Sequence, residues 1–148
     1  MYKLPRSIQV VIYSGSVNDR EYLLLKRIQT HGGFWQSVTG SLEQTETHLQ
    51  AAVREVKEET GISALEPQLI DLKIKNVFEI APQWLPKYAP GTTQNEEICF
   101  ALRTAQREIV LDRREHDAYV WTSFDQAMGM LYWESNKRAL LAANQLSA

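Results

Sequence analysis

The sequence predicts an α/β protein in which helices cover both faces of a mixed β-sheet. Strand-like and helix-like segments alternate along the 148 residues, and a chain of this length suits one domain around a single core. No repeat, linker or low-complexity tract interrupts the pattern, so we expect one domain over residues 1–148. Such segments form a layered sandwich, because each helix must bury an apolar face against the sheet.

Three strands are predicted in the first third of the chain. Residues 8–13 form an apolar, β-branched run, and residues 22–27 follow it after a turn-rich segment, so we expect these two strands to pair as a hairpin. A short strand over residues 35–39 then leads into a loop, which we expect to span residues 40–46.

A helix is predicted from Thr47 to about Thr60. Thr47 and Gln50 have the spacing of a capping box, and Gly61 is placed to end the helix. The apolar residues of this segment recur at helical spacing and are expected to pack on a face well away from its glutamates; they are Leu49, Ala52, Val53 and Val56.

The second half of the chain adds three predicted strands. A slip in the alternation of residues 69–80 suggests a β-bulge near Asn76, and residues 97–102 and 118–121 complete the sheet. Cys99 is the only cysteine, which excludes an intrachain disulfide and a zinc cluster, and we expect it to pack in the core.

Two further helices are expected near the end of the chain. Ser123 is placed to cap the first of them, whose apolar residues lie on one helical face from Phe124 to Tyr132. The second is expected over residues 135–145.

Three glutamates of the first predicted helix indicate a metal site. Glu55, Glu58 and Glu59 stand at positions i, i+3 and i+4, so they share one helical face. Neighbouring carboxylates repel one another unless a cation lies among them. A hard cation with oxygen ligands fits best, which indicates Mg²⁺ first and Mn²⁺ second.

The loop before this helix is expected to support the same site. Gly40 would let backbone approach a phosphate, and Glu46 lies near the helix start, where negative charge is favoured. We expect Arg54 to pair with Glu46 and hold the loop to the helix.

These residues belong to one continuous pattern from Gly40 to Ile62, which reads G-x5-E-x7-R-E-U-x-E-E-x-G-U with U aliphatic. By this pattern the chain resembles the Nudix hydrolase family. The resemblance implies the Nudix fold, an α/β/α sandwich with a mixed sheet, and metal-dependent hydrolysis of a diphosphate linkage by water. It also places the metal ligands of the family at Glu55, Glu58 and Glu59.

The resemblance leaves the general base open between a glutamate of the signature helix and one from a distant loop. Glu115 is the distant candidate, although its charged surroundings would also suit an ordinary solvated turn. The candidate catalytic residues are therefore Arg54, Glu58, Glu59 and Glu115, and the candidate metal ligands are Glu55, Glu58, Glu59 and Glu115.

Substrate contacts are expected from residues outside the helix. Basic side chains would bind phosphates, aromatic side chains would stack on a flat heterocycle, and short polar ones would read its edge. Core packing of the aromatics and solvation of the basic residues are the alternatives. The candidates are Lys26, Arg27, Trp35, Gln36, Ser37, Gly40, Lys87 and Tyr88.

Three segments suggest a particular substrate. Residues 34–40, 87–91 and 115–121 resemble the branch of the family that acts on 7,8-dihydroneopterin triphosphate in folate biosynthesis. That resemblance implies release of pyrophosphate and formation of dihydroneopterin monophosphate.

Three other functions stay open. A broad or oxidised-purine nucleoside triphosphate pyrophosphatase would use the same aromatics. A hydrolase of dinucleoside polyphosphates or RNA 5′ ends is less favoured, because the chain is slightly acidic. A non-catalytic nucleotide sensor is disfavoured, because a pure binder has no need of three mutually repelling carboxylates.

Charge and hydropathy restrict the partners. A net charge of -2 provides no extended basic surface for nucleic acid. The apolar run near the start is too short for a signal peptide, and no stretch reaches membrane-spanning length. We therefore expect a cytoplasmic enzyme with a small-molecule substrate and neither a nucleic-acid nor a membrane partner. The sequence does not determine the oligomeric state.

Overall fold

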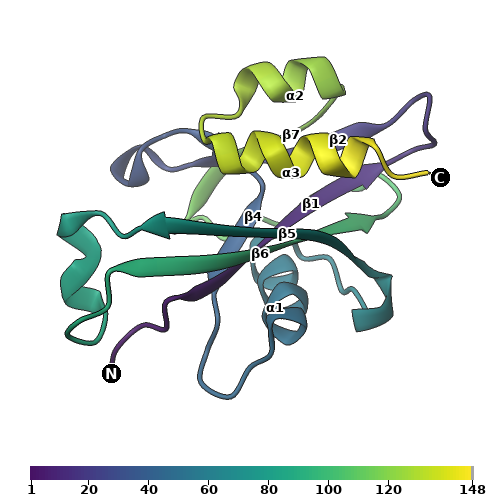
Figure 1. The fold of residues 1–148 in the computed structure, drawn as a ribbon. Helices are drawn as coiled ribbons and strands as arrows, with labels where there is room; N and C mark the ends of the chain where they lie inside the picture. The colour runs from purple at the N-terminus through teal and green to yellow at the C-terminus, as the bar shows by residue number, and fades with distance from the viewer. Residues whose placement is uncertain (148) are drawn as a thin grey trace.

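The centre of the molecule is a mixed 7-stranded sheet, seen in a computed structural model that describes residues 1–147 (Figure 1). Strand β1 (Arg6–Ser14) pairs in parallel with β6 (Gln94–Arg103). β6 pairs antiparallel with β5 (Leu69–Glu79), which forms one edge of the sheet. Parallel and antiparallel pairs together make the mixed sheet that the sequence predicted.

The other side of β1 is shared by two strands. β4 (Val38–Ser41) pairs with the first half of β1, from Ser7 to Val10, and β2 (Glu21–Arg27) pairs with its last residues. β2 therefore diverges from β4 and pairs with β3 (Trp35–Gln36) and β7 (His116–Thr122). Because β2 and β4 pair with different halves of β1, the sheet divides at this point, and β7 joins it through β2.

Helices cover both faces of the sheet, as Figure 1 shows. α1 (His48–Thr60) lies on one face, and α2 (Phe124–Met130) and α3 (Glu134–Asn144) lie on the other. Each face has its own buried cluster: Ile8, Val56 and Phe100 belong to the α1 side, and Val11, Tyr22 and Leu140 to the α3 side. The predicted α/β/α sandwich is confirmed.

Short 3-10 helices complete the connections: η1 (Gln29–His31), η2 (Glu66–Gln68) and η3 (Pro82–Lys87). η3 lies in the long connection between β5 and β6, at one end of the sheet.

The predicted limits of α1 are confirmed. The Thr47 hydroxyl accepts a hydrogen bond from the Gln50 amide, the Gln50 side chain accepts one from the Thr47 amide, and Gly61 ends the helix with φ +80°. A left-handed residue at this position favours glycine. The apolar face packs as expected, with Ala52 and Val56 fully buried.

The segment before α1 differs from its prediction. The strand expected over residues 35–39 is two short strands, β3 and β4, separated at Ser37. Gly40 and Ser41, predicted to be loop, belong to β4, because β1 continues to pair with them at Ile8 and Ser7. The loop therefore begins at Leu42.

The bulge in β5 was placed wrongly. The register shift lies between Asp71 and Ile74, whereas Asn76 pairs regularly with Glu97. Lys73 adopts φ +58° there, and its amide donates to the Asp71 carboxylate at 2.7 Å. A side-chain acceptor that holds a local turn is a common reason for such an irregularity.

The C-terminal helices follow the predicted pattern: α3 lies one residue earlier than the predicted 135–145, and α2 is shorter than expected. Ser123 caps α2 by accepting from the Gln126 amide, as expected. The helix ends at Met130, because Leu131 is extended and forms a bridge with Trp35, so Tyr132 lies outside it. Cys99 is fully buried in β6, which confirms its predicted place in the core.

Candidate active site

Helix α1 presents the three signature glutamates at different depths. The side chain of Glu59 is 6% exposed, that of Glu55 14% and that of Glu58 52%. Among residues 1–147 no three His, Cys, Asp or Glu side chains already form a metal-binding group. The expected separation of apolar stripe and glutamates was wrong for Glu59, which is buried one helical turn from Val56.

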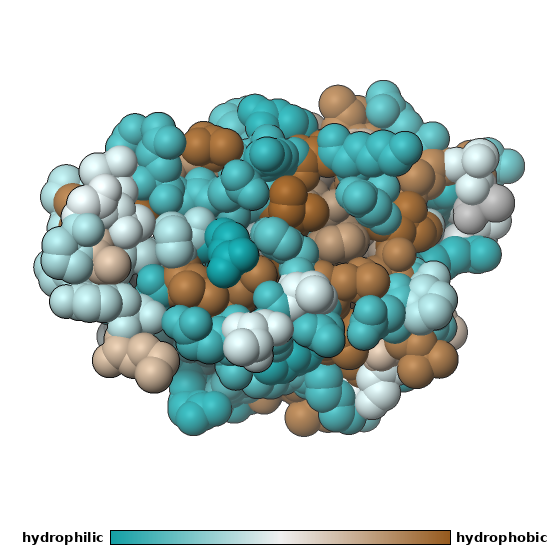
Figure 2. Space-filling model, turned by 60° about the horizontal axis from the view of Figure 1, so that its bottom comes forward, coloured by the Kyte–Doolittle hydropathy of each residue, from teal (hydrophilic) through white to brown (hydrophobic). Residues whose placement is uncertain are grey.

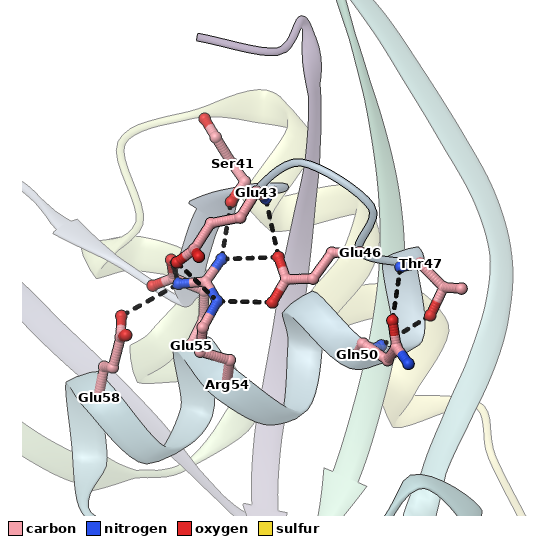
Figure 3. A network of polar contacts seen from close by, with 8 residues as sticks. All are labelled: Ser41, Glu43, Glu46, Thr47, Gln50, Arg54, Glu55 and Glu58. Atoms are coloured by element: carbon pink, nitrogen blue, oxygen red, sulfur yellow. Dashed lines mark hydrogen bonds and ion pairs between the residues drawn. The ribbon is translucent and has the colours of Figure 1, made fainter. Parts of the chain in front are cut away.

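Arg54 supplies positive charge among these carboxylates (Figure 3). Its guanidinium donates to both oxygens of Glu46 at 2.7 and 3.0 Å, to Glu55 at 2.8 Å and to Glu58 at 3.2 Å. It also donates to the Ser41 carbonyl at 3.0 Å. The predicted pair between Arg54 and Glu46 is confirmed, and it ties the signature loop to the helix.

Gly40 makes room for the Glu55 carboxylate. A Cβ atom at position 40 would lie 2.2 Å from Cδ and 2.4 Å from Oε1 of Glu55. The glycine is therefore explained by close approach of a side chain to the β4 backbone. Burial raises the pKa of Glu55 to about 7, although Arg54 opposes the shift.

Glu59 is the most deeply buried glutamate of the helix. Its Oε2 has no hydrogen-bond partner, and its Oε1 lies 3.5 Å from Nδ1 of the fully buried His116. Burial, and then the negative charge of Glu55, raise the pKa of Glu59 well above its ordinary value, while Arg27 opposes the shift. An unpartnered buried carboxylate oxygen is costly unless a ligand satisfies it.

Glu115 reaches this region through the pairing of β2 with β7. Arg27 at the end of β2 donates to Glu115 Oε2 at 2.8 Å, and His31 Nδ1 lies 3.7 Å from the same oxygen. Arg27 and Glu115 both influence the pKa of Glu59, in opposite directions. The structure thus brings the distant candidate base close to the signature helix.

Lys3 is a further candidate for the site, and the sequence analysis did not include it. Its amide donates to the Lys87 carbonyl at 2.8 Å, and burial followed by the charge of Lys87 lowers the pKa of Lys3. Arg27, Glu115 and Glu55 also influence that pKa. Lys3 could not be found from sequence, because only the bridge between Lys3 and Tyr88 brings the N-terminal segment here.

The predicted substrate residues divide between the two faces of the sheet. Gln36 points toward α1, where its Nε2 lies 3.2 Å from Nε2 of His116. Trp35, the next residue along the strand, packs on the α3 side and bridges Leu131. Lys26 pairs with Trp35 across the sheet and lies 3.9 Å from Asp117. Trp35 and Lys26 therefore do not join the group around Glu59.

The remaining substrate candidates are Ser37, Lys87 and Tyr88. Ser37 is buried, and its hydroxyl has no partner. Tyr88 is 9% exposed, and Lys87 Nζ lies 4.4 Å from the centre of the Trp84 ring. Lys87 also lines an open pocket of ≈ 690 Å³, together with residues 1–4 and 42–44.

A second aromatic group also escaped the sequence analysis. Phe34 stacks on Tyr132 with a centroid separation of 5.6 Å, and Trp133 meets both rings edge-on. Tyr132 is 64% exposed and Trp133 47% exposed. The sequence separates them by about a hundred positions, so only the bridge between Trp35 and Leu131 brings them together.

The residues present fit a hard divalent cation. Glu55 and Glu59 both have raised pKa values, and Oε2 of Glu59 is buried without a partner. A divalent cation would favour the ionised carboxylates and satisfy that oxygen. On the α1 side, strongly hydrophilic residues lie among hydrophobic ones, so polar groups are accessible on this face (Figure 2).

A group of glutamates beside arginine side chains is typical of an enzyme that hydrolyses a phosphoric anhydride with a bound divalent metal. The NUDIX domain model matches residues 3–143, and the chain belongs to this family. It is a Nudix hydrolase, and hydrolases of this family generally use divalent metal ions.

Two relatives and one solved structure show where in the family it lies. The chain is 42% identical to dihydroneopterin triphosphate diphosphatase of Escherichia coli K12, over 95% of this chain and 92% of that protein. It is 37% identical to the Haemophilus influenzae protein of the same name, over 94% and 87% of the two chains. The structure of the E. coli dihydroneopterin triphosphate pyrophosphohydrolase superposes with a TM-score of 0.79 and covers 95% of this chain and 94% of that chain.

No helix within residues 1–147 has the length and apolar character needed to cross a membrane.

Proposed function

We propose that this protein hydrolyses 7,8-dihydroneopterin triphosphate to dihydroneopterin monophosphate and pyrophosphate, with Mg²⁺ as the metal. The observation that carries the proposal is the 42% identity to a diphosphatase of that substrate over 95% of the chain. The reaction consumes one water and breaks one P–O bond between the α- and β-phosphates. Mn²⁺ is an alternative metal, since it accepts the same oxygen ligands.

Glu55 and Glu59 would hold the metal from the helix, and Glu58 would complete the ligand set from the more exposed side, whereas Glu115, the fourth candidate ligand, would act as the general base. When bound, the metal would neutralise phosphate charge and lower the pKa of an attacking water. Arg54 would not contact substrate in this scheme. It holds Glu46, Glu55 and Glu58 in one network and so keeps the ligands in place.

Three basic side chains would bind the triphosphate. Arg27, Lys3 and Lys87 come from separate segments. Arg27 pairs with Glu115 at 2.8 Å, and Lys3 and Lys87 line the same open pocket. Their positive charge would orient the phosphate chain toward Glu59 and Glu55 and oppose the charge that builds up on pyrophosphate as it leaves.

Glu115 is the general base that this arrangement favours. Its Oε2 accepts from Arg27 at 2.8 Å and lies near His31, which leaves Oε1 to take a proton from water. The hydrogen bond from Arg27 would hold the carboxylate oriented for that transfer. A small-molecule substrate and a cytoplasmic location remain part of the proposal.

The test is pyrophosphate release with Mg²⁺ from dihydroneopterin triphosphate, measured beside dATP and 8-oxo-dGTP at matched concentrations. We expect kcat/KM to favour the pterin about 100-fold, equivalent to about 2.7 kcal/mol of discrimination. Comparable rates on the purines would instead establish a general nucleoside triphosphate pyrophosphatase, and absence of release from every substrate would overturn the reaction itself.

A further inference from the structure

A chain of three buried polar side chains joins the sheet to Glu59. Gln36 in β3 is 5% exposed, His116 at the start of β7 is 0% exposed, and Glu59 is 5% exposed. Gln36 Nε2 lies 3.2 Å from His116 Nε2, and His116 Nδ1 lies 3.5 Å from Glu59 Oε1. We propose that His116 is a positioning residue, which orients the Glu59 carboxylate for metal binding and is itself oriented by Gln36.

The two contacts require the same tautomer of His116. The Gln36 amide nitrogen is a donor, so the histidine Nε2 that faces it must accept. A neutral imidazole then carries its proton on Nδ1, which is the atom that faces the glutamate. Glu59 Oε1 is an acceptor when ionised, so it needs a donor at that same position. The Gln36 contact therefore selects the Nδ1-protonated ring in the metal-free protein, and the Glu59 contact requires the same ring once that carboxylate is ionised.

Strand pairing holds Gln36 and His116 in fixed positions. β3 and β7 both pair with β2, with Gln36 opposite Leu25 and His116 opposite Arg27. The imidazole therefore has a fixed place relative to the sheet, whereas Glu59 belongs to α1. His116 Nδ1 and Glu59 Oε2 are both buried without a hydrogen-bond partner, and Nδ1 lies 3.5 Å from Oε1. From this position on the sheet side the ring would fix the rotation of the metal-bound carboxylate and leave Oε2 for the cation.

Groups that orient metal ligands in this way usually matter for affinity, and their loss costs about 10- to 100-fold in metal binding or activity. The inference rests on the proposed role of Glu59 as a ligand. It goes beyond that role, because it assigns the orientation of Glu59 to His116 and Gln36, which would touch neither metal nor substrate.

The decisive pair of variants is His116→Asn and His116→Leu. The Asn amide nitrogen takes roughly the place of histidine Nδ1 and can still donate to Glu59, whereas Leu fills the site without a donor. We expect His116→Leu to weaken Mn²⁺ binding by about tenfold or more and to lower kcat with little change in KM, and His116→Asn to recover most of the Mn²⁺ affinity. Mn²⁺ binding is measured by electron paramagnetic resonance without substrate.

Gln9→Leu is the matched control, since Gln9 is also a buried amide but lies on β1 facing the α3 side. Its Mn²⁺ affinity should equal that of the unmodified protein, and circular dichroism identifies any variant that fails to fold. Equal Mn²⁺ affinity in the Leu and Asn variants, whether high or low, would overturn the positioning role.

A second measurement does not depend on metal at all. Nitrogen-15 chemical shifts of the ring in the metal-free protein should show the proton on Nδ1 of His116, and Gln36→Leu should reduce that preference. A proton found on Nε2 would overturn the proposal. If the unmodified protein binds no Mn²⁺, the proposed function fails, while the tautomer still decides whether the chain of contacts exists.

Discussion

Glu59 and Glu97 are two glutamates with nearly the same burial, 5% and 6% exposed, on opposite sides of the central sheet. Glu97 Oε1 accepts from Gln9 at 3.1 Å and from Asn76 at 3.0 Å, with the Cys99 thiol at 3.9 Å. Glu59 has a buried oxygen with no partner.

Burial raises the pKa of both carboxyls, but the neighbouring groups affect the two pKa values differently. At Glu97 the hydrogen bonds from Asn76 and Gln9 oppose the shift, whereas at Glu59 the charge of Glu55 adds to it. A buried acid whose oxygen accepts several hydrogen bonds from neighbouring side chains is part of the architecture. A buried acid left unsatisfied beside a second carboxylate indicates a site that a ligand completes.

The largest effect should come from exchanging each acid for its amide. Glu59→Gln is expected to lower kcat/KM by a factor on the order of 10³, because a neutral amide is a poor ligand for a hard cation. Glu97→Gln should retain activity within about threefold, because it lies outside the metal pocket. Steady-state pyrophosphate release measures both. Equal decreases in kcat/KM in the two variants would show that any buried glutamate is needed for activity, and that the unpartnered oxygen of Glu59 has no special role.

A glycine substitution tests how closely the pocket is packed. Gly40→Ala would force the Glu55 carboxylate away and should lower activity about 100-fold. Gly129→Ala is the control, because nothing lies within 4 Å of a Cβ atom at that position in α2. That change should leave activity intact and raise the free energy of unfolding by about 0.5–1 kcal/mol. An active Gly40→Ala enzyme would contradict the observed approach of Glu55 to β4.

Metal affinity should depend on pH through Glu55. Its pKa is raised to about 7, so protons compete with metal below that pH. Affinity is therefore highest above pH 7 and falls as the pH decreases, by about tenfold between pH 8 and pH 6 for one competing proton. Mn²⁺ titrations at several pH values measure this, and Glu97→Gln should follow the same curve. A flat profile would remove Glu55 from the ligand set.

The smallest expected effect is that of Glu97 on the pH dependence of the free energy of unfolding. Its pKa is raised in the folded protein, so its contribution to folding is fully present below the unfolded pKa and is lost as the pH rises through the folded pKa. Compared with Glu97→Gln, the unmodified protein should therefore lose relative stability as the pH increases from about 4.5. Urea unfolding of both proteins at pH 4.5, 6 and 8 measures the difference. A gap that grows in favour of the unmodified protein at high pH would reverse the assigned direction.

Local patterns were enough to predict most of the elements. The capping residues Thr47 and Gln50, the helix-ending Gly61 and the Ser123 cap act within a few positions of their own segment, so the sequence shows them directly. The bulge in β5 was misplaced because Asp71 and Lys73 form a local turn that hydrophobic alternation does not report. The break at Ser37 depends on which neighbour β1 pairs with, and that is a property of the whole sheet.

The sequence by itself determined the fold class, the signature helix and the carboxylates that are expected to bind metal, because each depends on spacing within one segment. The tertiary structure alone decided which glutamate is buried, why residue 40 is glycine and how Arg27 and Glu115 meet. It also separated Gln36 from Trp35, although the two are adjacent in the chain. These are contacts between distant segments, and strand pairing, rather than local pattern, creates them.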